Sequence, residues 1–223
     1  MSTGTVVRSL AITLLLTSTA LAAEPLRTVH DVPRNNVWVL QPDGVYLHDA
    51  TSRALKQRFE LPGWIHAGEP YACGPALAVD AQGAAVVSSD VVPILWRIDP
   101  LKFQVTTHQL VLDADADKDV GFSSLTYAAE QGVFFAVSSV YGSLWRIDPL
   151  LRRAQKIPLS APLAKACELA AERTKTRHTP VLVMCPARTA RNGWSIHLTP
   201  DQRSAYVFPR YCAQETTLQS KLP

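Results

Sequence analysis

The chain has 223 residues, of which 22 are basic and 19 acidic, so its formal net charge is only +3. The longest basic run is the pair Arg152 and Arg153, whereas binding to nucleic acid requires a concentrated basic face, and nucleic acid is therefore excluded as an expected partner. The 16 prolines and 10 glycines interrupt the chain at short intervals, which predicts short strands and turns and excludes long helices.

The first 22 residues have the pattern of a secretory signal peptide. Arg8 supplies a positive charge, and residues 10–22 are uncharged, mostly apolar, and end in an Ala-Leu-Ala cleavage site. This stretch is shorter than the ~20 residues that a bilayer-spanning helix needs, and no later segment is long enough either. We expect cleavage after Ala22 or Ala23, no membrane insertion afterwards, and one mature domain, residues 23–223, that is periplasmic or secreted.

The string Leu-Trp-Arg-Ile-Asp-Pro occurs twice, at residues 95–100 and 144–149. Each copy follows a segment that reads as two apolar strands around a Gln-Gly turn, residues 75–89 and 123–139. A further strand, residues 104–112, follows the first copy. The order of inner strand, turn, second strand, third strand and fourth strand predicts four-stranded propeller blades.

The tryptophans of the repeated string, Trp96 and Trp145, are expected to pack between blades. Residues 35–62 read as the last three strands of a blade whose first strand is missing, a gap that a strand from the other terminus fills in circular propellers. Residues 167–187 read as the start of another blade. The tail, residues 195–209, reads either as the third and fourth strands of that blade or as a fresh inner hairpin.

These patterns predict an all-β, propeller-like fold with about four blades of four-stranded antiparallel sheet. The segment ALAVDAQGAAVVSS followed by LWRIDP resembles the repeats of NHL, YVTN and gluconolactonase-type propellers, and LTPDQRSAYV resembles the YVTN form. The resemblance covers about residues 35–210 and implies an architecture that is shared by lactonases, dehydrogenases, scaffolds and receptors. Such proteins usually have about six or seven blades. The chain is therefore expected to form either a small ring or an incomplete one that needs a partner or a homodimer.

All four cysteines lie in the mature chain, where an even number indicates disulfides. Superposition of the later blade on residues 123–139 through a shared Ala-Ala-Glu sequence places Cys167 and Cys185 opposite each other on neighbouring strands. This favours a Cys167–Cys185 disulfide and, by elimination, a Cys73–Cys212 disulfide. Free buried thiols or a metal site are the alternatives, although no CxxC motif or nearby pair of histidines supports zinc.

Alternating carboxylates follow the predicted fourth strand of the blade that holds the first repeated string: Asp113, Asp115, Asp117 and Asp119. Four carboxylates repel one another unless something neutralises them, and Ca²⁺ takes about six to eight oxygen ligands. The match to an EF-hand loop ends at Lys118, where glycine is expected. The segment is interpreted either as a solvated acidic turn or as a weak Ca²⁺ site. It belongs to the loops around the mouth of the central channel, where ligands of this fold usually bind.

No residue pattern identifies a catalytic site. The histidines lack metal-binding spacing, and the chain has neither a G-x-S-x-G elbow nor a glycine-rich phosphate loop. Gluconolactonase-type enzymes hold a divalent metal with a glutamate, asparagines and an aspartate, and no such set is recognisable in the inner strands. The sequence therefore favours an exported, non-catalytic binding or scaffold protein for a protein or small-molecule ligand. A Ca²⁺-dependent hydrolase of the gluconolactonase type, or a degenerate propeller without independent function, is the alternative.

Overall fold

The computed structural model describes residues 24–64, 74–113, 121–138, 143–157, 194–202, 204–209 and 218–221. The signal-peptide residues lie outside these ranges. Within them the regular structure consists of strands and one 3-10 turn, Val32–Arg34, which confirms the all-β prediction. The strands form four sheets. Of the described residues, none belongs to a helix long and apolar enough to cross a membrane.

The first sheet contains four antiparallel strands in chain order: β1 (Arg27–Asp31), β2 (Asn36–Gln41), β3 (Gly44–Asp49) and β4 (Leu55–Phe59). The prediction that this blade lacks its first strand is wrong. β1 pairs with β2 along its whole length, from Arg27 opposite Leu40 to Asp31 opposite Asn36. Its sequence, RTVHD, conceals the strand because only Val29 is apolar, and backbone hydrogen bonds to β2 take the place of an apolar run.

The second and third sheets contain the repeated string. Their strands are β5 (Leu77–Val79), β6 (Ala85–Ser88), β7 (Ile94–Asp99) and β8 (Gln104–Gln109), and then β10 (Phe122–Ala128), β11 (Val133–Ser138), β12 (Leu144–Ile147) and β13 (Arg153–Ile157). In both sheets the string Leu-Trp-Arg-Ile lies in the third strand and the Gln-Gly turn joins the first two, as the repeat predicts. A short strand, β9 (Val111–Leu112), follows the second sheet and pairs in parallel with β13 of the third.

The third strand of each of the first three sheets leads to an aspartate that organises the turn into the fourth strand. The Oδ1 atom of Asp99 accepts hydrogen bonds from the backbone N–H groups of Leu101 at 2.8 Å and Lys102 at 3.0 Å. Asp49 and Asp148 accept the corresponding bond, from the N–H two residues ahead, at 3.0 and 2.8 Å. Backbone N–H groups are the main reason why the pKa values of Asp49 and Asp99 lie below their ordinary value.

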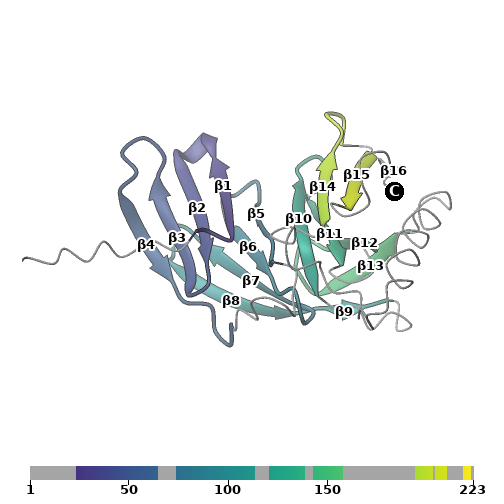
Figure 1. The fold of residues 1–223 in the computed structure, drawn as a ribbon, viewed down its shortest axis with the longest axis horizontal. Helices are drawn as coiled ribbons and strands as arrows, with labels where there is room; N and C mark the ends of the chain where they lie inside the picture. The colour runs from purple at the N-terminus through teal and green to yellow at the C-terminus, as the bar shows by residue number, and fades with distance from the viewer. Residues whose placement is uncertain are drawn as a thin grey trace, which may run out of the picture.

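The fourth sheet consists of β14 (Trp194–Leu198), β15 (Ser204–Pro209) and β16 (Leu218–Lys221). Of the two interpretations of the tail, the structure supports a fresh inner hairpin, because β14 lies beside the inner strand β10 (Figure 1). The N–H of Ile196 donates to Ser124 Oγ at 3.1 Å, and the N–H of Glu130 donates to Gln202 Oε1 at 3.0 Å. Residues 167–187, which were expected to start a blade, lie outside the described residues.

Apolar side chains fill the spaces between neighbouring sheets. Trp96 of the second sheet belongs to a buried cluster with Trp38 of the first, and its Nε1 donates to the carbonyl of Pro62 at 2.8 Å. Trp145 of the third sheet belongs to a second buried cluster, which includes Leu95 of the second sheet. The prediction that the repeated tryptophans pack between blades is confirmed.

The four sheets stand side by side in sequence order (Figure 1). Their first strands contact one another in the order β1, β5, β10 and β14, so they form the inner side of the row. Arg27, at the start of β1, links three sheets, because its Nη2 donates to the carbonyls of Gly74 at 3.3 Å and Ser123 at 3.2 Å. Consecutive sheets whose first strands converge in this way are arranged as propeller blades, and the fold is propeller-like.

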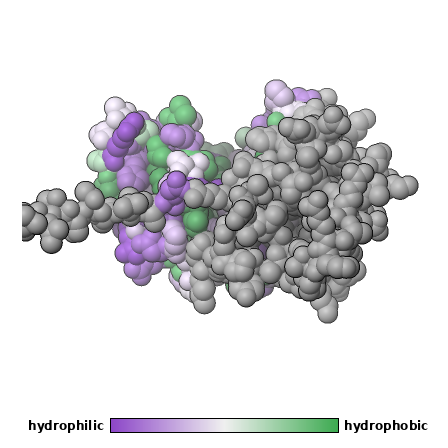
Figure 2. Space-filling view, in the orientation of Figure 1, coloured by the Kyte–Doolittle hydropathy of each residue, from purple (hydrophilic) through white to green (hydrophobic). Residues whose placement is uncertain are grey.

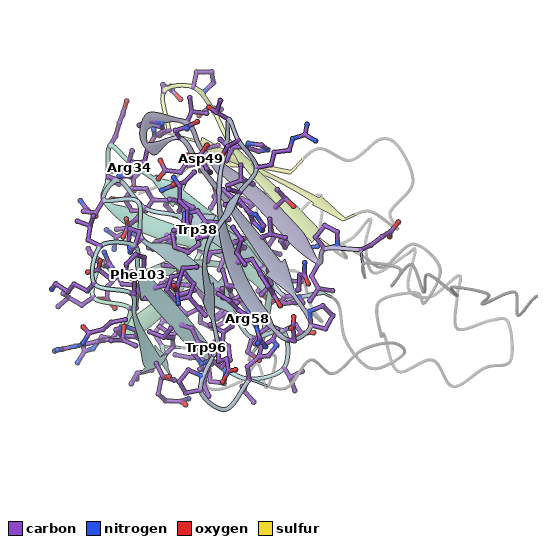
Figure 3. All side chains as sticks on the ribbon, turned by 90° about the vertical axis from the view of Figure 1, so that its left-hand side faces the viewer. Arg34, Trp38, Asp49, Arg58, Trp96 and Phe103 are labelled. Atoms are coloured by element: carbon purple, nitrogen blue, oxygen red, sulfur yellow. The ribbon has the colours of Figure 1, made fainter. Side chains whose placement is uncertain are left out.

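The first sheet ends this row on one side. Hydrophilic and hydrophobic residues are interspersed over this part of the surface (Figure 2). On the outward face Tyr46 stacks on His48 with ring centroids 6.5 Å apart, and the Arg58 guanidinium lies 5.8 Å from the centre of the tyrosine ring. Figure 3, which faces this sheet, places Arg58 toward one end of it and Arg34 and Asp49 toward the other.

Candidate functional site

The propeller arrangement divides the loops into two sets. Turns that close the first and last hairpins of a sheet lie at one end of the strands, and connections between the second and third strands or between sheets lie at the other. The segments that carry the predicted acidic cluster and the cysteines all belong to the second set, the connections between the second and third strands or between sheets. Most predicted site residues lie outside the described residues: Asp115, Asp117, Asp119, Cys73, Cys167, Cys185 and Cys212. The Ca²⁺ site and the two disulfides therefore stay predictions.

Asp113, the first residue of the acidic cluster, directly follows β9. Its backbone N–H donates to the carbonyl of Ala154 at 3.1 Å, and its Oδ1 accepts a hydrogen bond from the N–H of Lys156 at 2.8 Å. These bonds fasten the start of the acidic segment to β13 of the third sheet. Within the described part of the chain, no group of three or more His, Cys, Asp or Glu residues could hold a metal ion.

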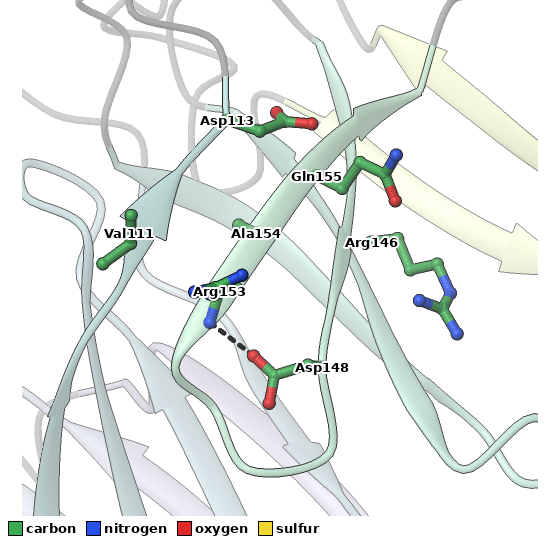
Figure 4. A pocket seen from close by; sticks show the side chains of 7 residues that line it. All are labelled: Val111, Asp113, Arg146, Asp148, Arg153, Ala154 and Gln155. Carbon is green, nitrogen blue, oxygen red and sulfur yellow. Dashed lines mark hydrogen bonds between the residues drawn. The ribbon is translucent and has the colours of Figure 1, made fainter.

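A pocket of about 520 Å³ lies beside Asp113, at the outer edge of the third sheet (Figure 4). Its lining comes from β9, β12, β13 and the residues next to them: Val111, Asp113, Arg146, Asp148, Arg153, Ala154 and Gln155. Arg146 on β12 and Gln155 on β13 are paired in register, so they lie side by side. The volume is within the range of ~300–1,000 Å³ that small-molecule sites occupy.

The two carboxylates of the pocket serve the fold through hydrogen bonds to the backbone. Asp148 accepts bonds from the N–H groups of Leu150 at 2.8 Å and Arg152 at 2.9 Å, and from the N–H of Arg153, which Figure 4 marks. Asp113 holds the β9–β13 contact in the same way, through Lys156. Backbone N–H groups stabilise the charged carboxylate and so offset part of the negative charge that these side chains bring to the pocket.

The two guanidinium groups of the pocket are in a different situation. Arg146 is half-buried and Arg153 exposed, and neither guanidinium forms an ion pair or hydrogen bond with another described residue. In Figure 4 the Arg146 side chain starts near Gln155, and its guanidinium extends away from Asp148. The pocket thus presents two cationic donor groups and one neutral amide whose hydrogen-bonding capacity is unused within the described structure. A group of this kind can bind an anion.

His108 on β8 is a titratable group in the space between the second and third sheets. Burial lowers the pKa of its imidazole, and the positive charges of Arg97 and Arg152 lower it further. Its Nε2 lies 3.1 Å from the hydroxyl of Thr106. A histidine with a lowered pKa is mostly neutral at pH 7, so it adds no full positive charge to this boundary.

Arg146 and Arg153 were not predicted as site residues, because the expected ligand position was the channel mouth. The signal that could have identified them is a difference between the two repeats. Both copies of the repeated string contain an arginine, but the hairpin before the first copy has Asp80 at the end of its inner strand, whereas the hairpin before the second has Ala128.

Among solved structures, the chain is similar to hydrazine synthase from Kuenenia stuttgartiensis, with a TM-score of 0.51 and 10% identity over 86% of this chain and 44% of that chain. It is also similar to an auxiliary nutrient binding protein from Bacteroides thetaiotaomicron (TM-score 0.49, 10% identity, 89% and 38% covered) and to the dihydro-heme d1 dehydrogenase NirN (TM-score 0.46, 15% identity, 82% and 32% covered). The first of these similarities supports the fold and nothing beyond it.

The chain spans less than half the length of each of these solved proteins. No protein-family model matches the sequence, and no curated protein matches it. The resemblance to NHL, YVTN and gluconolactonase-type repeats is therefore supported at the level of propeller-like architecture, without a family.

Proposed function

We propose that this protein is an exported, non-catalytic binding protein that holds a small molecule or a short protein segment against its third sheet. The observation that carries the proposal is the pocket of about 520 Å³ beside β13, in which charged side chains from paired strands face a shared space. Binding sites of small molecules are typically concave and contain a few polar groups on a rigid support.

The chemistry of the lining favours binding over catalysis. A general base needs a lone pair within hydrogen-bonding reach of the substrate, and an arginine cannot supply one because it stays protonated. The amide of Gln155 does not titrate. The carboxylates of Asp113 and Asp148 hold backbone N–H groups, so moving either of them toward a substrate would disrupt a turn or the β9–β13 contact.

Export follows from the N-terminal sequence, in which a short uncharged apolar stretch ends in an Ala-Leu-Ala site. The protein would therefore meet its ligand in the periplasm or outside the cell.

The test uses the full chain, produced with its own N-terminal sequence and purified from the periplasm. A panel of neutral, acidic and basic small molecules is added at millimolar concentration, and thermal unfolding is followed by circular dichroism. A ligand present at ~100 times its Kd adds ~2.7 kcal/mol to the free energy of unfolding, which raises the Tm by several degrees. Turnover of lactones or esters by the same preparation, or a panel without any stabilising compound, would contradict the proposal.

A further inference from the structure

The two copies of the repeated string give their arginines different surroundings. In the second sheet, Nη2 of Arg97 lies 2.5 Å from Oδ2 of Asp80, whose side chain is only 2% exposed. Oδ1 of the same carboxylate accepts hydrogen bonds from the N–H groups of Gln82 and Ala84, both at 2.9 Å. Arg97 is therefore neutralised by a fixed, buried anion that belongs to its own sheet.

In the third sheet that anion is absent at the equivalent position. Strand register aligns Arg146 with Arg97, because Phe135 and Val86 are their partners on the second strands, and it aligns Ala128 with Asp80. Ala128 is fully buried and uncharged. The Arg146 guanidinium consequently has no carboxylate of its own sheet at this position, and it lines the pocket instead.

Arg153 adds a second guanidinium on the same side of the sheet. Arg153 and Gln155 are two residues apart on β13, so their side chains lie on one face, and Gln155 is the register partner of Arg146. Two guanidinium groups and an amide donor thus face one cavity. The planar fork of an arginine matches the two oxygens of a carboxylate and donates to both.

We propose that the pocket formed by Arg146, Arg153 and Gln155 binds the carboxylate group of a small organic acid, which gives Arg146 the kind of anionic partner that Arg97 has in Asp80. This inference rests on the proposed binding function and specifies the chemical class of its ligand. A volume of about 520 Å³ accommodates a metabolite-sized acid in addition to the carboxylate itself.

The first experiment measures the affinity of the full, exported chain for citrate by isothermal titration calorimetry, with triethyl citrate and inorganic phosphate as comparison probes. Citrate should bind, its neutral ester should bind at least about tenfold more weakly, and phosphate should compete only if the site accepts any oxyanion. Equal affinity for citrate and its ester would overturn the inference. Binding of phosphate with the same affinity as citrate would overturn the specificity for carboxylates, because the pocket would then bind oxyanions in general.

The variants Arg146→Gln and Arg153→Gln should each weaken citrate binding at least about tenfold, since each removes a charge-assisted hydrogen bond. Arg53→Gln is the matched control, because it removes the same charge from an exposed turn of the first sheet, and it should change the affinity by less than about twofold. Unchanged affinity in both pocket variants would overturn the inference.

A reciprocal variant supplies the missing anion. Ala128→Asp gives Arg146 the partner that Arg97 has, so citrate binding should be lost although both arginines remain. Ala128→Asn introduces a side chain of nearly the same volume as aspartate without the charge and should retain binding, which separates neutralisation from disturbed packing.

If neutral compounds of the panel stabilise the protein and citrate does not bind, the inference fails and the proposed function stands. If neither citrate nor any panel compound binds, the proposed function itself fails.

Discussion

The outward face of the first sheet and the corresponding faces of the second and third sheets occupy the same place in the repeat but differ in chemistry. Strand register puts Tyr46 of β3 where β7 has Trp96 and β12 has Trp145. The two tryptophans are 3% and 0% exposed, whereas Tyr46 is half-buried. One position of the repeat is thus part of the core in two sheets and part of the surface in the first.

The neighbouring positions follow the same trend. The first sheet has a more polar side chain at four equivalent positions: Thr28 for Leu77, His30 for Val79, Tyr46 for Trp96 and His48 for Ile98. Tyr46 also uses its hydroxyl, which donates to Asp43 Oδ2 at 2.6 Å. A polar outer face is typical of the terminal unit in a repeat array, because it keeps the end of the array in solution. The first sheet therefore has the composition of an end unit.

The largest difference in stability is expected between Trp96 on the second sheet and Tyr46 at the equivalent position on the first. Trp96→Ala should lower the free energy of unfolding by about 3–5 kcal/mol, because it removes a buried ring and leaves the Pro62 carbonyl without its donor. Tyr46→Ala should cost about 1 kcal/mol, since its side chain is already partly in water. Urea unfolding followed by circular dichroism measures both. Equal losses would mean that the outward face of the first sheet is covered in solution.

Two valines at equivalent positions differ in burial and not in polarity. Val87 on β6 is fully buried, whereas Val39, at the equivalent position on β2, is half-buried. Val87→Ala should lower the free energy of unfolding by about 2 kcal/mol, and Val39→Ala by less than about 1 kcal/mol, because less apolar area leaves water at the second site. The urea midpoints of the two variants provide the measurement. A larger loss of stability at Val39 than at Val87 would mean that the outward face of the first sheet is the more buried one.

Restoring the apolar residues should affect association more than stability. The double variant Thr28→Leu and His48→Ile gives the outward face of the first sheet the apolar residues that the second sheet has at these positions. Its free energy of unfolding should change by less than about 0.5 kcal/mol. Sedimentation velocity should show concentration-dependent self-association that the unmodified chain lacks at the same concentration, because the new face is a contiguous apolar patch. An unaltered sedimentation profile would show that these polar residues do not keep the face in solution.

The smallest expected effect is a pH dependence at the boundary between the second and third sheets. The pKa of folded His108 lies below its ordinary value, so the folded state disfavours protonation, and the stability that this provides is lost as pH falls below ~6.5. Urea midpoints should therefore decline slightly between pH 7.5 and 5.5. His108→Gln should reduce the decline of the urea midpoint with falling pH. An unchanged decline in this variant would mean that another group causes it.

Most of the architecture could be predicted from the sequence, because the residues that pack between sheets and close turns recur in each repeat. Trp96 and Trp145 recur in identical strings, since each must fill the same space between sheets, and the aspartates after them recur because each closes a turn. β1 was missed because Val29 is the only apolar residue in it. Its residues, such as Thr28 and His30, therefore carry no strand pattern.

The site was predicted less well, and the reason is physical. Clustered residues are visible in a sequence, and the alternating carboxylates from Asp113 onward form such a cluster. The pocket instead depends on a missing partner: Arg146 repeats Arg97, but Ala128 replaces Asp80. A charge that lacks a partner among the described residues leaves no motif in a single sequence, and only strand register shows that Ala128 stands where Asp80 does.

The parallel pairing of β9 with β13 has a consequence for how the molecule unfolds. In a linear array each unit touches only its neighbours, so units at one end can open while the others stay folded. Val111 and Leu112 pair with Arg153 and Ala154, which lie about 40 residues further along the chain. This short strand, which leaves the second sheet, is thus the edge strand of the third sheet and joins the two. Neither sheet can therefore open at that edge without releasing the other, and the two should behave as one cooperative unit in hydrogen exchange.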